Sequence, residues 1–94
     1  MNIEQIDNGS KGAFIIKVND DRLAEMTYSR AGDKLIIIDH TEVSDSLRGK
    51  GAGKQLVTAA VEHARKNKLK ILPLCPFARA VFDSTSEFND VLSI

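Results

Sequence analysis

The sequence is short of several residue types, and each shortage excludes a class of protein. A single cysteine among 94 residues cannot form an internal disulfide, so we expect a reducing, cytoplasmic compartment. Thirteen basic and thirteen acidic residues leave no net charge, which argues against a nucleic-acid-binding or membrane-surface role. The sequence shows no apolar run long enough to cross a bilayer and no signal-peptide pattern.

Metal ligands are also scarce. His40, His63 and Cys75 are too few and too scattered for the spacing of a zinc site, so we expect no metal cofactor. The length and a hydrophobic content of 43% are those of one globular domain. We therefore expect a single domain over residues 1–94 that acts as a monomer.

Glycine, by contrast, is concentrated in one place. Three of the six glycines lie with three cations in the stretch Arg48–Lys54. The stretch follows an apolar run, Leu35–Val43, and opens an amphipathic run that continues to about Lys66, so it lies at a strand-to-helix junction. A helix N-terminus offers free N–H groups and partial positive charge, and glycines let a ligand approach the backbone closely. The stretch therefore predicts a phosphate or pyrophosphate cradle.

Two common phosphate motifs do not fit this stretch. A Walker A loop would need glycine where Arg48 stands and a hydroxyl where Gln55 stands. The dinucleotide fingerprint G-x-G-x-x-G lacks its last glycine from either possible start. A third pattern, Arg/Gln-x-x-Gly-x-Gly/Ala, does fit at Arg48, Gly51 and Gly53. A glycine-rich turn before a helix, without a ligand, stays open as the alternative.

The apolar patterns predict an α/β fold in the wider sense that includes α+β. The expected strands, in chain order, are residues 2–6, 14–18, 22–30, 35–43 and 69–74. The main helix should run from the glycine loop to about residue 66, with His63 on its solvated side and without a role. Shorter helices should cover 77–83 and, after a capping box at 84–87, a last turn to about residue 92.

Turn lengths predict how these strands pair. Short connections make the first four strands antiparallel, and the strand–helix–strand span predicts a parallel pair of 35–43 with 69–74. Because residues 35–38 are apolar on both faces, we expect that strand to be covered on both sides.

The strand 35–43 ends in polar residues directly before the glycine loop. Strict alternation would place His40 and Glu42 on one side of the strand and Asp39 and Thr41 on the other. The position of His40 favours a functional role, and a hydrogen-bonded structural histidine stays open as the alternative.

Two prolines, Pro73 and Pro76, bracket Cys75 at the end of the last strand. Because proline cannot donate to a sheet ladder, pairing should fail here, and the two parallel strands should splay apart near Val43 and Cys75. A gap between strand ends beside a helix N-terminus is a natural ligand crevice.

Three local strings sharpen this interpretation: His40-Thr41-Glu42-Val43, Arg48-Gly49-Lys50-Gly51 and Pro73-Leu74-Cys75-Pro76-Phe77. Together with the glycine loop, in this order and spacing, they resemble the GNAT superfamily of acetyl-CoA-dependent N-acetyltransferases. The match is to its small single-domain branch, sometimes called YidJ-like or NATD-type, and it covers nearly the whole chain. The resemblance implies a minimal GNAT-like fold that uses acetyl-CoA as co-substrate and acetylates an unidentified amine.

Carried over by position, the resemblance also implies how CoA would bind. The backbone around Thr41 to Val43 would pair with the pantetheine arm, and the N–H groups of the loop would hold the pyrophosphate. Lys50 or Lys54 could reach the adenosine 3′-phosphate, with solvated surface lysines as the alternative, and the thioester would end near Cys75. The implied cofactor-binding residues are Thr41, Val43, Arg48, Gly49, Lys50, Gly51, Ala52, Gly53 and Lys54.

The catalytic candidates are His40, Glu42 and Cys75. Direct transfer needs a base for the acceptor amine, which could be His40 or Glu42, and a proton donor for the leaving thiolate, which could be Cys75. Alternatively, Cys75 could itself take the acetyl group, which would need His40 or a helix N-terminus nearby to favour the thiolate. Cys75 as a small buried apolar residue stays open as well.

The sequence departs from the full-length GNAT pattern in two features. It has no room for both the helical segment that covers the acceptor site and further C-terminal strands, and residues 77–83 contain no tyrosine where many of these enzymes place a general acid. A non-catalytic CoA- or acyl-CoA-binding module therefore stays open as the alternative function, as does a protein-interaction domain with a vestigial loop.

Overall fold

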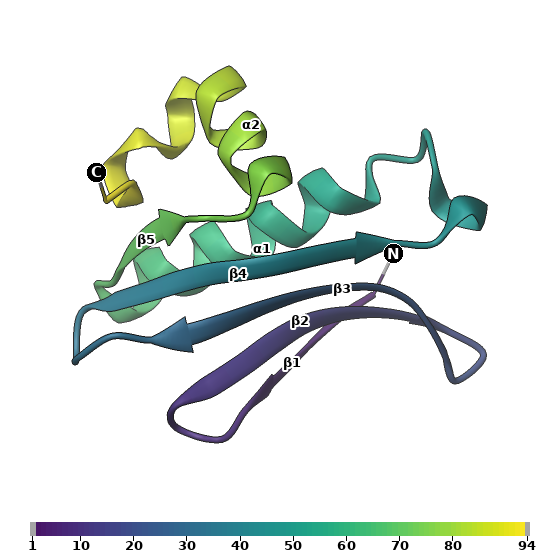
Figure 1. Cartoon of the computed structure of the whole chain (residues 1–94), viewed down its shortest axis with the longest axis horizontal. Helices are drawn as coiled ribbons and strands as arrows, with labels where there is room; N and C mark the ends of the chain where they lie inside the picture. Colours follow the sequence, from purple (N-terminus) through teal and green to yellow (C-terminus); the bar gives the residue numbers. More distant parts are fainter. Residues whose placement is uncertain (1, 94) are drawn as a thin grey trace.

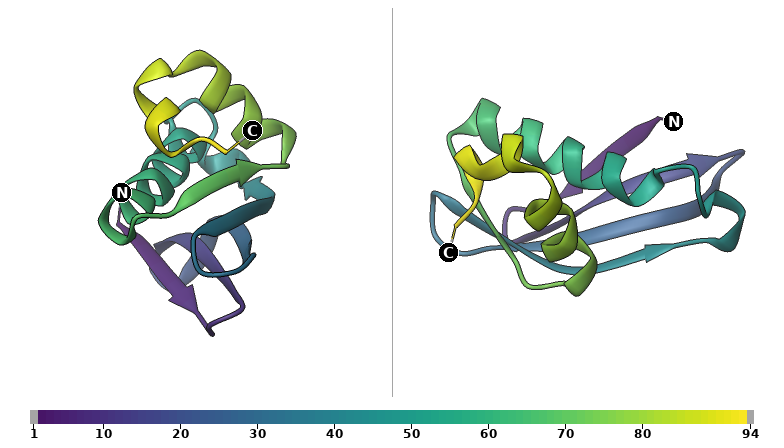
Figure 2. Two further views of the ribbon diagram at one scale, coloured as in Figure 1. Left: turned by 90° about the vertical axis from the view of Figure 1, so that its left-hand side faces the viewer. Right: turned by 90° about the horizontal axis from the view of Figure 1, so that it is seen from above.

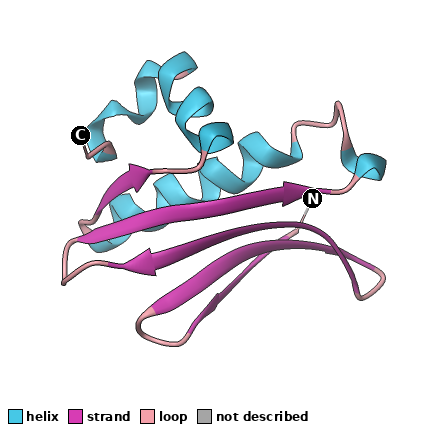
Figure 3. Ribbon diagram, viewed as in Figure 1, coloured by secondary structure: helices cyan, strands magenta, loops and turns pink. Residues whose placement is uncertain are grey.

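The computed structural model describes residues 2–93, which form one five-stranded sheet with helices packed on one face (Figure 1). The strands, in order across the sheet, are β1 (Ile3–Asp7), β2 (Lys11–Val18), β3 (Asp21–Arg30), β4 (Leu35–Val43) and β5 (Lys70–Pro73). The helices are the 3₁₀ turn η1 (Asp45–Leu47), α1 (Ala52–Asn67), α2 (Pro76–Ser84) and the 3₁₀ helix η2 (Ser86–Val91) (Figure 3). Among these described helices, none is long and apolar enough to span a bilayer.

The pairing of the strands confirms the predicted fold class. β1 to β4 pair antiparallel in sequence order, and β5 pairs parallel with β4. The parallel pair is joined by α1, which packs on one face of the sheet (Figure 2). The crossover brings β5 back beside β4, and the glycine loop lies between the end of β4 and the start of α1.

α1 supplies the centre of the core because its apolar side chains recur on one stripe. The buried members of the stripe are Leu56, Val57, Ala60, Val61 and Ala64. They form one hydrophobic cluster with the inward side chains of β2, β3, β4 and α2. α1 ends at Asn67, and the left-handed backbone of the following Lys68 (φ 58°) lets the N–H of Leu69 donate to the carbonyl of Ala64 at 2.8 Å.

The prediction that both faces of β4 are covered was wrong. Ile36 and Ile38 face α1 and are fully buried, whereas Leu35 and Ile37 lie on the other face and are half-buried. The crossover helix can shield only the face on which it packs, so the outer face of this strand stays partly open. That open face becomes important at the site, because β4 carries the polar residues that precede the loop.

A β-bulge at Asp39 changes which side chains of β4 face the helices. Ile38 pairs with Tyr28 and His40 pairs with Thr27, so Asp39 has no partner on β3. The extra residue shifts the alternation by one position. Thr41 therefore faces the helix side, as Ile38 does, and Asp39 joins His40 on the outer face, where it accepts a hydrogen bond from Ser29 at 2.7 Å. The prediction that Asp39 and Thr41 share a face was wrong for this reason.

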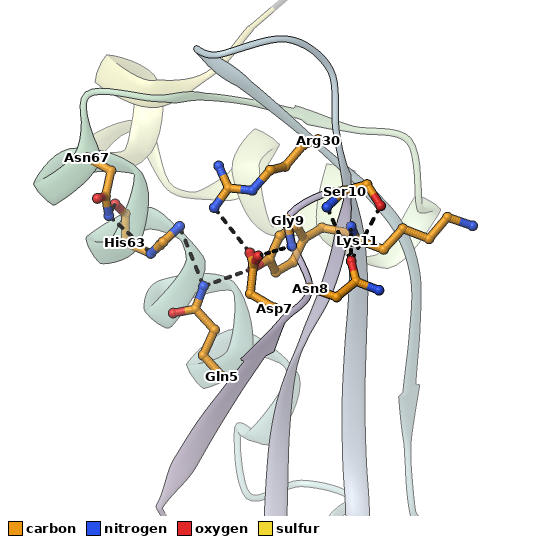
Figure 4. A network of polar contacts seen from close by, with 10 residues as sticks. Gln5, Asp7, Asn8, Gly9, Ser10, Lys11, Arg30, His63 and Asn67 are labelled. Carbon is orange, nitrogen blue, oxygen red and sulfur yellow. Dashed lines mark hydrogen bonds and ion pairs between the residues drawn. The ribbon is translucent and has the colours of Figure 1, made fainter.

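The edge strand β1 is joined to the body of the sheet through Tyr28 on β3. The Tyr28 ring is buried and crosses β2 at Gly12, where an added Cβ would collide with the ring. Its hydroxyl donates to Asp7 Oδ2 at 2.5 Å and accepts from Gln5 Nε2 at 2.8 Å. Arg30 donates to the same carboxylate oxygen at 3.1 Å (Figure 4). We call Gln5, Asp7, Tyr28, Arg30 and His63 the Tyr28 cluster.

His63 lies in this cluster, which corrects the prediction that it is on the solvated side of α1. Its ring stands edge-on to Phe14, with 6.0 Å between centroids, and tilted against Tyr28 at 6.5 Å. Partial burial lowers the pKa of His63, and the Arg30 cation lowers it further. The helical pattern alone could not show that side chains of β1 and β2 reach this part of α1, with Gln5 beside the ring (Figure 4).

The C-terminal helices also differ in one detail from the prediction. Ser84 and Thr85 do not start a capping box, since Thr85 is the N-cap of η2 without a side-chain bond and the Ser84 hydroxyl donates back to the carbonyl of Val81. Arg65 of α1 holds η2 instead, with two guanidinium nitrogens donating to the Asp90 carboxylate at 3.0 and 2.9 Å.

Candidate functional site

The loop between β4 and α1 is built around two glycines with left-handed backbone. Gly49 and Gly51 have φ of 78° and 72°, where a side chain would strain the backbone. Leu47 is buried below the loop, and its carbonyl accepts from the N–H of Lys50 at 3.1 Å. The chain therefore enters α1 through a defined turn, with Gly51 as the N-cap.

Several backbone amides of this loop are free to bind an anion. The N–H groups of Arg48 and Lys50 are used inside the turn, by the carbonyls of Asp45 and Leu47. Within residues 2–93 no acceptor is found for five others: those of Gly49, Gly51, Ala52, Gly53 and Lys54. No described side chain caps α1 or adds negative charge in its first turn. The donors and the positive end of the helix dipole are thus open to a ligand.

β4 and β5 pair only as far as Ile38, which confirms the predicted gap. The N–H groups of Leu74 and Cys75 both donate to the carbonyl of Ile38, at 3.1 and 3.2 Å. Beyond that point β4 continues to Val43, while the other strand turns into α2 at Pro76. β4 and the segment that follows β5 therefore leave an opening beside the glycine loop.

The separated end of β4 directs unpaired backbone groups into this opening. Ser44 donates to the carbonyl of Leu23 on β3, and backbone direction alternates along a strand. The N–H and C=O groups of Thr41 and Val43 therefore point away from β3, to the side that β5 has left. A ligand with amide groups could pair there as an extra strand would.

The loop, the gap and α2 together enclose a hollow of about 390 Å³, which is within the range of ligand pockets. It is lined by Thr41, Val43, Leu47, Arg48, Gly49, Gly51, Ala52, Gly53, Lys54 and Phe77. Of the residues expected to bind the cofactor, all but Lys50 are in this lining. The tertiary structure therefore brings the expected residues of β4 and those of the glycine loop together around one hollow.

Cys75 lies at the inner end of the opening. Its side chain is 6% exposed, and its Sγ donates to Thr41 Oγ1 across the gap at 3.3 Å. Cys75 is also the N-cap of α2, and the next residue is proline, which has no N–H of its own. The thiol thus lies at the positive end of a helix and in contact with a residue that lines the hollow.

His40 and Glu42 come together, but not with Cys75. His40 Nε2 is 3.0 Å from Glu42 Oε1, and the two side chains are 65% and 75% exposed on the outer face of the sheet. That face is opposite to the one from which Thr41 contacts Cys75, because neighbouring residues on a strand alternate faces. Glu42 and Val43 line a second hollow of about 460 Å³ on this outer side. Val43 borders both hollows, so the end of β4 lies between them.

The loop cations are exposed. Arg48 Nη2 donates to Asp45 Oδ1 at 2.8 Å, with both side chains more than 80% in solvent. Among the described residues, the ion pairs include neither Lys50 nor Lys54. Lys54 lines the hollow, and Lys50 is exposed on the loop beside it.

The part of the chain that contains the strand gap and the glycine loop matches a known family. A family model described as GCN5-related N-acetyl-transferase matches residues 13–91 of the chain. The chain belongs to the GCN5-related N-acetyltransferase family. This confirms the GNAT resemblance inferred from the three sequence strings.

Curated relatives of this GNAT chain are found in vertebrates. Protein NATD1 of Xenopus tropicalis is 36% identical over 64 residues, which cover 66% of this chain and 58% of that protein. The human protein of the same name is 34% identical over 64 residues, covering 66% and 56%. The chain therefore spans little more than half the length of these relatives.

Solved structures agree with the GNAT fold. A GCN5-like protein of Staphylococcus aureus is 42% identical, with a TM-score of 0.75 over 98% of this chain and 89% of that one. The protein AAC(6')-Iy, in complex with a CoA bisubstrate analogue, is 14% identical with a TM-score of 0.59, over 82% and 61% of the two chains. The second likeness shows the fold alone.

Sequence reasoning missed two residues that line the hollow, Leu47 and Phe77. Phe77 lines the hollow, although its position on an expected short helix gave no indication of the direction in which it points. The sequence did contain a signal for Phe77. It lies two residues after Cys75, at the start of a helix that was expected beside the loop.

Proposed function

We propose that this chain is an acetyl-CoA-dependent N-acetyltransferase that moves an acetyl group to an amine. The observation that carries the proposal is the joining of an uncapped α1 N-terminus to the unpaired edge of β4 in one hollow. One end of the hollow offers N–H donors and cations for phosphates, and the other offers strand-like backbone groups, with the Cys75 thiol in contact with Thr41 of the lining. CoA has these parts in the same order.

Each part of the CoA-binding site is proposed on residues that the hollow brings together. The free amides from Gly49 to Lys54 would hold the pyrophosphate, and Lys50, Lys54 or Arg48 would neutralise the remaining phosphate charge. The backbone of Thr41 and Val43 would pair with the amides of the pantetheine arm. The arm would then end beside Cys75.

The two faces of β4 suggest how an acceptor amine would arrive. The outer hollow, lined by Glu42 and Val43, lies at the start of β3 and the end of β4, and the end of β4 separates it from the inner hollow. An amine entering from that side would meet His40 and Glu42, either of which could accept its proton as the new N–C bond forms. Cys75 on the inner side could then protonate the leaving CoA sulfur as the C–S bond breaks.

The second route makes Cys75 the nucleophile. Its thiolate would form a thioester with the acetyl group and release CoA, and the amine would then take the acetyl group from Cys75. Of the two aids expected for the thiolate, the α2 N-terminus is present, whereas His40 lies on the opposite face. The sole tyrosine, Tyr28, is bonded to Asp7 far from the loop, so it leaves Cys75 as the candidate acid for direct transfer.

A CoA-binding module without catalysis is the second candidate function, favoured by the lack of a tyrosine in α2. Transfer assays over a panel of amines and proteins separate the two candidates. Cys75→Ala should lower acetyl transfer more than it lowers CoA affinity, because a chemical role acts on the transition state. An acetylated Cys75 peptide after brief incubation with acetyl-CoA would identify the second route. A fully active Cys75→Ala variant, with a thiol that stays inert in the native protein, would remove Cys75 from both routes.

CoA binding itself is tested with a matched pair of glycine variants. Gly51→Val places a branched side chain on the phosphate path and should weaken CoA binding in calorimetry at least tenfold, or about 1.4 kcal/mol. Gly32→Val is the control: its φ of 76° imposes the same backbone strain, and an added Cβ also meets open space. Gly32 lies in the β3–β4 turn, away from the loop. Equal CoA affinity of folded Gly51→Val and Gly32→Val proteins would contradict the assignment of the loop.

A further inference from the structure

Phe77 is a large apolar side chain that the proposed CoA contacts do not yet use. It lies on the first turn of α2 and is 42% exposed. Its ring lies directly over Gly53 in the first turn of α1, since a Cβ built on Gly53 would collide with three of the ring atoms. Phe77 also lines the inner hollow. The N-terminal turns of the two helices thus meet at this contact.

The contact explains why residue 53 is glycine. Gly49 and Gly51 need left-handed backbone, but Gly53 is not among the residues with positive φ. A glycine within a helix is less favourable than alanine. An added Cβ at Gly51 would meet open space, whereas at Gly53 it would meet Phe77. The missing side chain at residue 53 therefore makes room for an aromatic ring, and not only for a phosphate group as the loop motif implies.

We infer that Phe77 is a positioning residue for the arm of CoA and that Gly53 is the seat of its ring. This inference rests on the proposed function. Thr41 and Val43 line the hollow from β4, and Phe77 lines it from α2. An arm that leads from the loop toward Cys75 passes between them, so the ring forms the apolar wall opposite the strand edge. Contact with the arm removes part of the exposed ring from water.

The seat is tested without a ligand by a double-mutant cycle on melting temperature. In the wild-type background Gly53→Ala should lower the melting temperature, because the ring must leave its place. In the Phe77→Ala background the same change should raise it, because alanine favours the helix once the ring is gone. The seat is refuted if Gly53→Ala has the same effect in both backgrounds.

The wall is tested by comparing CoA with ADP, which carries the phosphates without the arm. Phe77→Ala should weaken CoA binding about tenfold, the scale of a lost aromatic contact, and change ADP binding less than twofold. Leu74→Ala is the control, since Leu74 is 59% exposed on the other side of Cys75 and does not line the hollow; it should leave both affinities unchanged. Gly51→Val should weaken CoA and ADP alike.

Three results would overturn the inference. Equal losses for CoA and ADP in Phe77→Ala would show that the ring does not act on the arm. An equal loss of CoA affinity from Gly53→Ala with and without Phe77 would return Gly53 to direct phosphate binding. A wild-type protein that binds neither CoA nor ADP would end the proposed function and the wall together, while the melting cycle would still decide whether Gly53 seats Phe77.

Discussion

Tyr28→Phe removes one hydroxyl from the Tyr28 cluster and leaves the buried ring in place over Gly12. The hydroxyl makes two hydrogen bonds to the edge strand β1, to the Asp7 carboxylate at 2.5 Å and from the Gln5 amide at 2.8 Å. β1 has only β2 as a neighbour in the sheet. The change therefore weakens the attachment of one edge strand without opening a cavity in the core.

The expected loss of stability depends on the hydrogen bonds that Asp7 retains in the variant. A hydrogen bond to a charged group contributes about 1.5–3 kcal/mol to stability. Asp7 retains the backbone N–H of Gly9 at 2.7 Å and Arg30 at 3.1 Å, and its side chain is 25% exposed, so water can replace part of the loss. We therefore expect the free energy of unfolding to fall by about 1.5–2 kcal/mol. For a domain of this size that lowers the melting temperature by roughly 6–15 °C.

The destabilisation caused by Tyr28→Phe should depend on pH under both acidic and alkaline conditions. The Tyr28 hydroxyl is the main cause that lowers the pKa of Asp7 below 3.8, helped by the Gly9 N–H. A lowered carboxyl pKa gives stability that is present above the unfolded value and is lost as pH falls through the folded value. Burial of the hydroxyl and, after it, the hydrogen bond to Asp7 raise the pKa of Tyr28 above 10.0. A raised tyrosine pKa stabilises the folded protein at lower pH, and this stabilisation is lost as the pH rises through the folded value. The difference between wild type and variant should therefore be level near neutral pH and shrink below about pH 4 and above about pH 10.

Urea unfolding followed by circular dichroism measures this difference. Asp7→Asn provides the control background, because the amide cannot accept as a charged carboxylate does. Tyr28→Phe should then be less than half as destabilising as it is in the wild type. A loss below about 0.5 kcal/mol at pH 7, or an equal loss in the Asp7→Asn background, would refute the role of this hydrogen bond.

Two further predictions concern the same cluster. Gly12→Ala should destabilise the protein by about 1–3 kcal/mol in the same urea assay, because the new Cβ meets the Tyr28 ring and the backbone carbonyl of Ile6; no change would contradict the close packing at Gly12. His63→Gln should flatten the pH dependence of stability below neutral pH: the lowered pKa of His63 gives stability that is present above 6.5 and is lost as pH falls through the folded value. Identical slopes of unfolding free energy between pH 7 and 5 in the two proteins would contradict the burial of His63.

Much of the fold could be predicted from the sequence because its signals are local. Apolar runs, turn residues and the stripe on α1 each depend on residues a few positions apart, so the strands, the main helix and the parallel pair were predicted correctly. The loop Arg48–Lys54 and the strand gap at Cys75 also follow from local chemistry, through glycine conformation and the missing N–H of proline. The chain order alone was enough to place both beside the end of β4.

Only the tertiary structure decided which side chains meet. The bulge at Asp39 depends on the pairing of β4 with β3, and it places Thr41 against Cys75 and His40 on the opposite face. The burial of His63 needs β1, which is distant in sequence, and the seat of Phe77 needs two helix ends separated by a strand. Local periodicity carries the direction of a side chain relative to its own element. It contains no information on the packing of one element against another, and that packing determines the chemistry of the site.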